Sequence, residues 1–293
     1  MRASEAGTNK TSQADTLRSF PASFPPNLWA ALHPKPRIDR HNGKVPGLFA
    51  DDAVIRKVDS EPLLVLGGGR ALLMQLAHPQ VAAGVADHSR FQDDSFGRLR
   101  QTLTAMSEIE FGSDNQARAT AEALRAVHER VVGSGYRATD PALQLWVHAT
   151  LVDTSLRVYS RLFGPLPPAE AERYYQEKAL VAEVVGIPRA DQPADLGAFS
   201  RYLRATVSGL EVTDTARALA YDVLHPAWGI AAEPAVALHR QITAGLLPAR
   251  LRRQYGLGWD WPGQLALHLG TAFSRLVLPR VPAPVRRAPA LLL

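Results

Sequence analysis

Apolar residues recur along this chain at every third or fourth position, and no run of strict two-residue alternation stands out. Gly67–Gly69 is interpreted as a turn before the first long helix, and Pro46–Val58 leads into a short helix or extended segment that begins at Glu61-Pro62. The pattern predicts helices over residues 70–77, 79–87, 95–111, 114–132, 141–163, 169–185, 198–208, 214–224, 234–244, 248–255 and 262–276. We therefore expect an all-α protein with a single helical domain.

Local signals at the helix ends support several of these boundaries. Asp140-Pro141 is a strong start, since an N-cap residue is followed by proline at the first helical position. The helix that follows is apolar nearly all round in its first half, which contains Trp146 and His148, as expected for a helix in the middle of a bundle. Ser113 or Asp114 begins the preceding helix, which is predicted to end only at Gly133–Gly135.

The domain organisation follows from composition along the chain. Residues 1–50 form a proline-rich N-terminal arm, residues 51–280 a helical domain and residues 281–293 an irregular, arginine- and proline-rich tail. No apolar run reaches the length of a membrane span, and no apolar signal segment follows the early basic residues. We expect a protein that has no transmembrane segment and is cytoplasmic.

Composition excludes several classes of function. The 293 residues are 46% hydrophobic, enough for a full core. The chain has no cysteine, which rules out disulfides, thiolate catalysis and cysteine-ligated metals. The net charge of +5 is spread along the chain without a dense basic stripe, so we do not expect nucleic-acid binding.

The histidines carry the candidate chemistry. His128 lies on the apolar stripe of its helix with Ala117, Ala121, Leu124 and Val131. The chain has no Glu-x-x-His, His-Glu-x-x-His or Gly-x-Ser-x-Gly motif, so carboxylate-bridged di-iron, zinc-protease and serine-hydrolase sites are not indicated. A lone histidine on an apolar face suits haem, whose iron needs one proximal ligand. The alternative is a buried histidine that only hydrogen-bonds a neighbour, and this applies to His148 as well.

Three polar residues share one face of the helix over residues 95–111. Arg98, Gln101 and Thr102 stand at positions i, i+3 and i+4, beside an apolar stripe that contains Leu99, Leu103 and Met106. Such a trio is either one wall of a buried site or the solvent-exposed edge of an amphipathic helix, and both readings stay open on the pattern alone.

Several motifs, in order along the chain, resemble those of the MpaB/rubber oxygenase catalytic-domain family. The resemblance covers about Glu61 to Pro284 and is carried by Gly69–Leu73, Leu76–Pro79, Val81–Val85, His88–Phe91, Val127-His128 with Val131, Asp140–Leu151, Gly245–Pro248 and Tyr255–Leu257. It implies a helical, globin-like domain that binds haem b. Members of the family include latex clearing protein, which cleaves polyisoprene with dioxygen, and fungal enzymes that cleave prenyl chains.

The resemblance also implies roles for particular residues. His128 matches the proximal iron ligand of a His-x-x-x-Arg segment, although Val132 stands in the arginine position. Arg98, Gln101 and Thr102 match an Arg-x-x-Lys-Thr segment in which glutamine replaces lysine. Arg98 would pair with a haem propionate, Thr102 would bond a propionate or dioxygen, and Gln101 would donate to dioxygen. Because the family lysine can occupy the distal iron position at rest, its loss implies an open or water-bound site.

Other histidines have smaller implied roles. His148 is the alternative proximal ligand, because its helix is equally apolar and its motif matches equally well. His78 and His88 recur in the family pattern beside helix ends, and we interpret them as structural or supporting residues.

The function expected from the sequence is a haem b-dependent oxygenase that acts with dioxygen on a small hydrophobic substrate, possible candidates being olefins or isoprenoids, with an electron donor as a further partner. Two alternatives remain. One is a non-catalytic protein that binds haem or a lipophilic ligand. The other is a helical protein whose oxygenase site has decayed, for which Gln101 and Val132 are the relevant changes.

Overall fold

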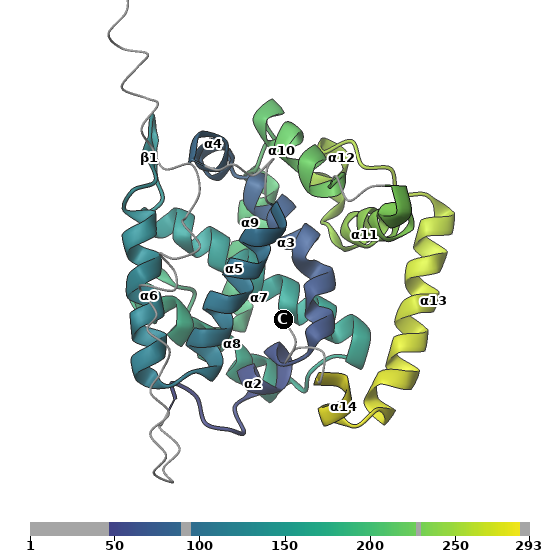
Figure 1. The fold of residues 1–293 in the computed structure, drawn as a ribbon, viewed down its shortest axis with the longest axis horizontal. Helices are drawn as coiled ribbons and strands as arrows, with labels where there is room; N and C mark the ends of the chain where they lie inside the picture. The colour runs from purple at the N-terminus through teal and green to yellow at the C-terminus, as the bar shows by residue number, and fades with distance from the viewer. Residues whose placement is uncertain (1–46, 89–94, 227–229, 288–293) are drawn as a thin grey trace, which may run out of the picture. The chain divides into compact units, whose positions relative to one another are not determined.

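The structure is a computed structural model that describes residues 47–88, 95–226 and 230–287, and helices dominate it (Figure 1). This confirms the predicted all-α class. Most of the predicted N-terminal arm, the motif residues Ser89 to Phe91, part of the predicted tail and the side chain of Arg98 lie outside the described part. Among the helices of these ranges, none is both long and apolar enough to cross a membrane.

The longer helices follow one another with short connections. They are α2 (Val54–Asp59), α3 (Gly68–Leu76), α4 (Pro79–His88), α5 (Ser95–Phe111), α6 (Asp114–His128), α7 (Pro141–Phe163), α8 (Pro168–Val184), α9 (Leu196–Gly209), α10 (Asp214–Leu224), α11 (Glu233–Leu246), α12 (Ala249–Gln254), α13 (Trp261–Val277) and α14 (Ala283–Arg287). Short 3-10 helices precede α3, α9, α11 and α14; they are Pro62–Gly67, Arg189–Asp191, Ile230–Ala232 and Leu278–Arg280. The described residues also contain a small ribbon, β1 (Val132–Gly133) paired antiparallel with β2 (Tyr136–Arg137).

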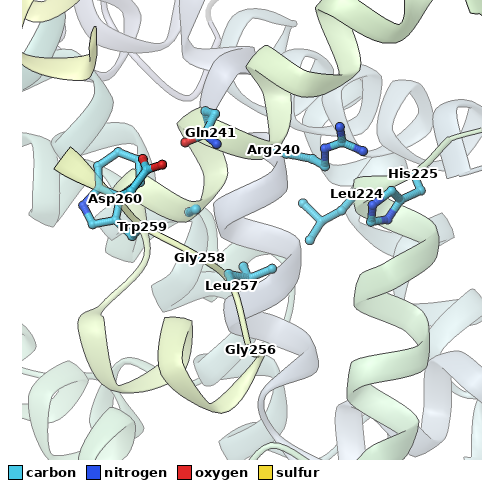
Figure 2. A pocket seen from close by; sticks show the side chains of 10 residues that line it. Leu224, His225, Arg240, Gln241, Gly256, Leu257, Gly258, Trp259 and Asp260 are labelled. Atoms are coloured by element: carbon cyan, nitrogen blue, oxygen red, sulfur yellow. The ribbon is translucent and has the colours of Figure 1, made fainter. Parts of the chain in front are cut away.

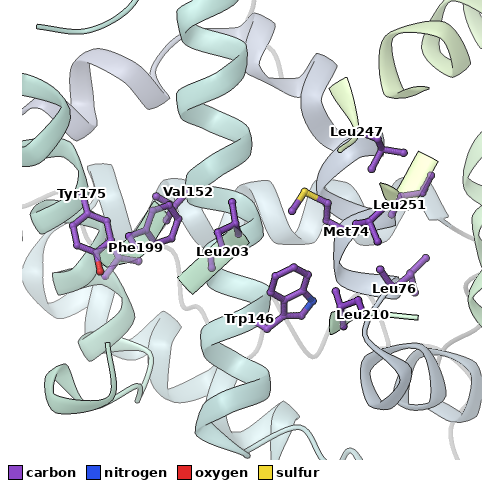
Figure 3. Close-up of a cluster of buried hydrophobic side chains, with 14 of the residues drawn as sticks. Met74, Leu76, Trp146, Val152, Tyr175, Phe199, Leu203, Leu210, Leu247 and Leu251 are labelled. Carbon is purple, nitrogen blue, oxygen red and sulfur yellow. The ribbon is translucent and has the colours of Figure 1, made fainter. Parts of the chain in front are cut away.

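Helix α7 is central to the fold, as its sequence predicted. The Asp140 side chain accepts a hydrogen bond from the Ala142 amide at 2.8 Å and so caps the helix, which stops at Gly164 in a positive-φ conformation. Helices α2, α3, α8 and α13 all contact α7. Trp146 is only 1% exposed and lies in the cluster of buried side chains shown in Figure 3. The prediction that this helix is among the most buried is confirmed.

The helix that carries His128 is shorter than predicted. It stops at His128, and the residues that follow turn into the β1–β2 ribbon instead of extending the helix to residue 132. Tyr136 explains the difference, because its buried ring packs near Gly84 of α4 and its hydroxyl donates to Asp87 Oδ2 at 2.7 Å. This tertiary contact outweighs the local helical pattern.

The triple glycine was also interpreted wrongly as a turn. Helix α3 begins at Gly68, and Gly69 lies inside it where α3 crosses α11. A Cβ atom on Gly69 would lie 2.2 Å from Thr243 Oγ1 and 2.7 Å from the His239 ring. The glycine therefore permits a close approach of two helices.

Candidate functional site

The predicted site residues are carried by the α5–α6 hairpin. Only Gly112 and Ser113 separate the two helices, so they run antiparallel, and Thr120 Oγ1 donates to Glu108 Oε2 at 2.8 Å between them. Ser113 caps the start of α6, because its hydroxyl accepts a hydrogen bond from the backbone amide of Gln116 at 3.2 Å. Because the helices are antiparallel, the first half of α5, with Arg98, Gln101 and Thr102, lies at the same end of the hairpin as His128, the last residue of α6.

His128 has the properties of an available imidazole. Its side chain is partly buried, and desolvation lowers the pKa of the ring, so the neutral form is favoured near neutral pH. Among the described residues, no hydrogen bond or ion pair involves the His128 ring, and its nitrogens are not among the buried polar atoms that lack a partner. A neutral ring with a free nitrogen lone pair can bind a metal ion.

The polar trio on α5 is described only in part. Gln101 and Thr102 are exposed in this structure. Nothing follows for Arg98, whose side chain lies outside the described part. The exposure of the two described side chains corresponds to the solvent-edge reading of this face, and their place in a site stays a prediction.

His148, the alternative ligand, lies close to helix α8. The backbone of Lys178 in α8 favours the charged form of the ring and acts to raise its pKa. Burial and the charge of Lys178 lower the pKa of His148 to about 3. The ring is therefore neutral, and it lies against the backbone of α8.

Lys178 belongs to a buried ionic cluster that the sequence did not point to. Its ammonium contacts Asp59 Oδ2 at 2.7 Å and the carboxylate of Glu110, and the Tyr174 hydroxyl donates to Asp59 Oδ1 at 3.1 Å. Burial alone would lower the pKa of Lys178, but Asp59 and Glu110 outweigh it and raise this pKa well above its usual value. Burial raises the pKa of Glu110, against the opposing attraction of Lys178. The signal available beforehand was a lysine four residues after Tyr174, on the apolar stripe of α8.

A second buried ionic group joins three helices. Arg70 in α3 is fully buried, and its Nε donates to the Leu246 carbonyl of α11 at 2.9 Å. Its other nitrogens contact Asp153 and Thr154 of α7, and Arg157 also pairs with Asp153 at 2.8 Å. Burial lowers the pKa of Arg70 to about 10 despite Asp153, so the guanidinium stays charged. Each of its three nitrogens has a protein partner, which is the pattern of a structural anchor.

The two remaining motif histidines lie near the β1–β2 ribbon. His88 is exposed, its Nε2 is 3.1 Å from the Val132 carbonyl oxygen, and its ring stands edge-on to Tyr136. His78 is partly buried; burial lowers its pKa against the opposing charge of Asp140, and its Nδ1 has no hydrogen-bond partner within the described residues. These contacts fit the structural role expected for His88, and they leave the role of His78 a prediction.

Two clefts lie elsewhere in the described part of the chain. One, of about 310 Å³, is lined by residues that include His225, Arg240, Trp259 and Asp260 (Figure 2). Its charged side chains already interact with other protein groups, since Arg240 forms an ion pair with Glu233 at 2.8 Å and Asp260 caps the start of α13. The other, of about 210 Å³, is almost wholly apolar and lies between α7, α11 and α13. Neither cleft includes any predicted site residue.

Haem is compatible with the donors that are present. Within the described residues, no three His, Cys, Asp or Glu side chains form a group that could hold a metal ion. A haem iron needs one protein nitrogen, and the unpartnered, neutral ring of His128 meets that requirement. His148 meets it less well, because its ring lies against the backbone and the positive charge of Lys178 in α8.

Comparisons with known proteins identify the family of this chain. The family model described as "ER-bound oxygenase mpaB/B'/Rubber oxygenase, catalytic domain" matches residues 55–276. An uncharacterized protein of Mycobacterium bovis and another of Mycobacterium tuberculosis are each 30% identical over 150 residues. These alignments span 48% of this chain and 59% of the length of each relative. No solved structure matches the chain.

Proposed function

This chain belongs to the ER-bound oxygenase mpaB/rubber oxygenase catalytic-domain family, and on that premise we propose that it is a haem b-dependent oxygenase. The proposed reaction consumes dioxygen and oxidises a small hydrophobic substrate, either by cleavage of a carbon–carbon double bond or by hydroxylation. An electron donor is needed in the second case, because hydroxylation inserts one oxygen atom and reduces the other to water.

The observation that carries the proposal is the state of His128. Its ring is neutral, partly desolvated and without a hydrogen-bond partner in the described part of the chain, at the end of α6 where the family ligand is expected. The ring nitrogens are not among the buried atoms without a partner, so they are open to a ligand. An iron atom would satisfy one nitrogen.

The residues of α5 would act around this ligand. Haem b, when bound, supplies the redox-active iron that oxygenase chemistry requires. Arg98, at the same end of the hairpin as His128, supplies a permanent positive charge suited to a propionate. Thr102 and Gln101 supply uncharged hydrogen-bond donors, and Gln101 cannot carry the charge of the lysine that it replaces.

Oxygen consumption tests this function. The haem-reconstituted protein is supplied with a reductant and a panel of olefinic and isoprenoid substrates, and dioxygen uptake and products are measured. We expect uptake that depends on substrate in the unsubstituted protein and in His268→Ala, which changes an exposed histidine, and loss of that uptake in His128→Ala. A protein that holds haem but consumes no dioxygen with any substrate would be a carrier and would contradict the proposal.

A further inference from the structure

Helix α13 has most of its large apolar residues on the outside. Trp261, Leu269 and Phe273 are 72%, 62% and 65% exposed, and no residue of this helix is buried. The side that turns toward α7 and α11 includes one large apolar side chain, Leu267, which packs near Gly245 of α11, and also Thr271. The other residues on this side are small: Gly263, Ala266, Gly270 and Ser274. These positions follow one another at spacings of three or four, so they form one stripe of the helix. The small side chains leave space between α13 and the helices beneath it.

That space is the apolar cleft of about 210 Å³. Its floor includes Val158 and Leu162 of α7 and Ile242 and Leu246 of α11. A dry apolar cavity of roughly 150 Å³ is enough to bind benzene, so this cleft has room for a longer hydrocarbon segment. It is also open on one side, which allows a chain to extend beyond it.

A positively charged side chain lines this apolar cleft. Arg161 of α7 lines it, and within the described residues its guanidinium makes no ion pair with a carboxylate. Two further arginines are close: Arg157 is paired with Asp153, whereas Arg275 of α13 donates only to the Ser160 and Arg161 carbonyls, at 2.8 and 3.2 Å. Burial and the like charges of Arg157 and Arg275 lower the pKa of Arg161. A bound anion would relieve this repulsion.

We propose that the cleft between α7, α11 and α13 binds a single-chain anionic amphiphile, whose hydrocarbon segment lies against the small-residue face of α13 and whose acidic head group pairs with Arg161. A carboxylate and a phosphate monoester share the required chemistry, and both match a guanidinium in charge and geometry. The site contains neither His128 nor any α5 residue, so it does not depend on the proposed oxygenase function.

The hydrocarbon part is tested by filling the cleft. A Cβ on Gly270 would have no atom within 4 Å, so Gly270→Leu adds its side chain to open space. The matched control is Leu269→Gln, which removes apolar surface from the outward face one residue away. With a fluorescent long-chain fatty acid as probe, we expect roughly tenfold weaker binding for Gly270→Leu and little change for Leu269→Gln. The reverse pattern would mean adsorption to the outer face and would overturn the proposal.

The fold of each variant is checked by circular dichroism, and Ala266→Leu, which fills the same cleft from the previous turn, replaces Gly270→Leu if that variant does not fold. Unchanged binding to a folded cleft-filling variant would also overturn the proposal.

The head group is tested with Arg161→Met, which keeps the apolar stem and removes the charge. We expect roughly tenfold weaker binding of the fatty acid and an unchanged affinity for the fatty alcohol of equal length. A prenyl monophosphate is measured in parallel with the fatty acid. The ligand that binds the unsubstituted protein more tightly identifies carboxylate or phosphate as the preferred head group. An equal loss of affinity for the fatty acid and the fatty alcohol in Arg161→Met would contradict recognition by Arg161. So would a failure of the unsubstituted protein to bind both the fatty acid and the prenyl monophosphate.

Discussion

At the scale of single residues, the ring of His148 makes the clearest prediction about pH. Its pKa is about 3 in the folded protein and about 6.5 in an unfolded chain. Between these values only the unfolded chain binds the proton, so the free energy of unfolding falls as the pH is lowered from 6.5 toward 3. From about pH 7 to about pH 5 this histidine should cost about 2 kcal/mol of stability.

Urea unfolding at the two pH values measures this effect. His148→Gln keeps an amide donor for the backbone of Lys178 but does not titrate, so we expect it to lose less stability on acidification than the unsubstituted protein. His268→Gln, at an exposed position, should behave like the unsubstituted protein. If His148→Gln shows the same pH dependence as the unsubstituted protein, His148 is not held neutral by its surroundings.

Gln101 makes a second prediction at this scale, which rests on the proposed haem. Because a glutamine amide is a poor iron ligand in place of lysine, we expect the ferric protein to lack a second nitrogen ligand and to bind cyanide or imidazole readily. Titration followed by visible absorption measures this. Gln101→Lys should bind both ligands more weakly, whereas a low-spin spectrum that is the same with and without Gln101 would argue against an open position.

At the scale of elements, the crossing of α3 and α11 depends on Gly69. Any larger residue there meets Thr243 Oγ1 and the His239 ring, so Gly69→Ala should lower the free energy of unfolding by about 1–3 kcal/mol. Gly270→Ala is the matched control, since it places the same methyl group on a helix where nothing lies within 4 Å. It should raise stability by about 0.5–1 kcal/mol. Equal effects of the two substitutions in urea unfolding would mean that the crossing is not tight.

Elements with strong local signals were predictable from the sequence, and those fixed by contacts between distant residues were not. Helix α7 was predicted from Asp140-Pro141 and from its apolar first half, because caps and periodicity act within a few residues. The end of α6 was not predicted correctly, because it depends on the contact of Tyr136 with Asp87. The role of Gly69 was missed for the same reason, since its partner Thr243 lies in α11.

At the scale of the whole molecule, the sequence predicted the all-α class and the family, because both rest on patterns spread over most of the chain. It did not reveal the cluster of Lys178 with Asp59 and Glu110, whose members come from α8, α2 and α5. Nor did it reveal the apolar cleft beside Arg161, which exists only where α7, α11 and α13 meet. Charges and spaces that several helices share become visible only when the chain is folded.

The central claim is that His128 binds haem iron, and haem content with the visible absorption spectrum tests it most directly. We would measure both for the unsubstituted protein, His128→Ala and His148→Ala after identical reconstitution with haem b. The account predicts stoichiometric haem in the unsubstituted protein and in His148→Ala, and loss of haem or a changed spectrum in His128→Ala. Of these two rings, His148 lies against Lys178, whereas no hydrogen bond or ion pair involves His128 within the described residues. Full haem with an unchanged spectrum in His128→Ala would contradict the assignment, and an unsubstituted protein that never takes up haem would contradict the cofactor itself.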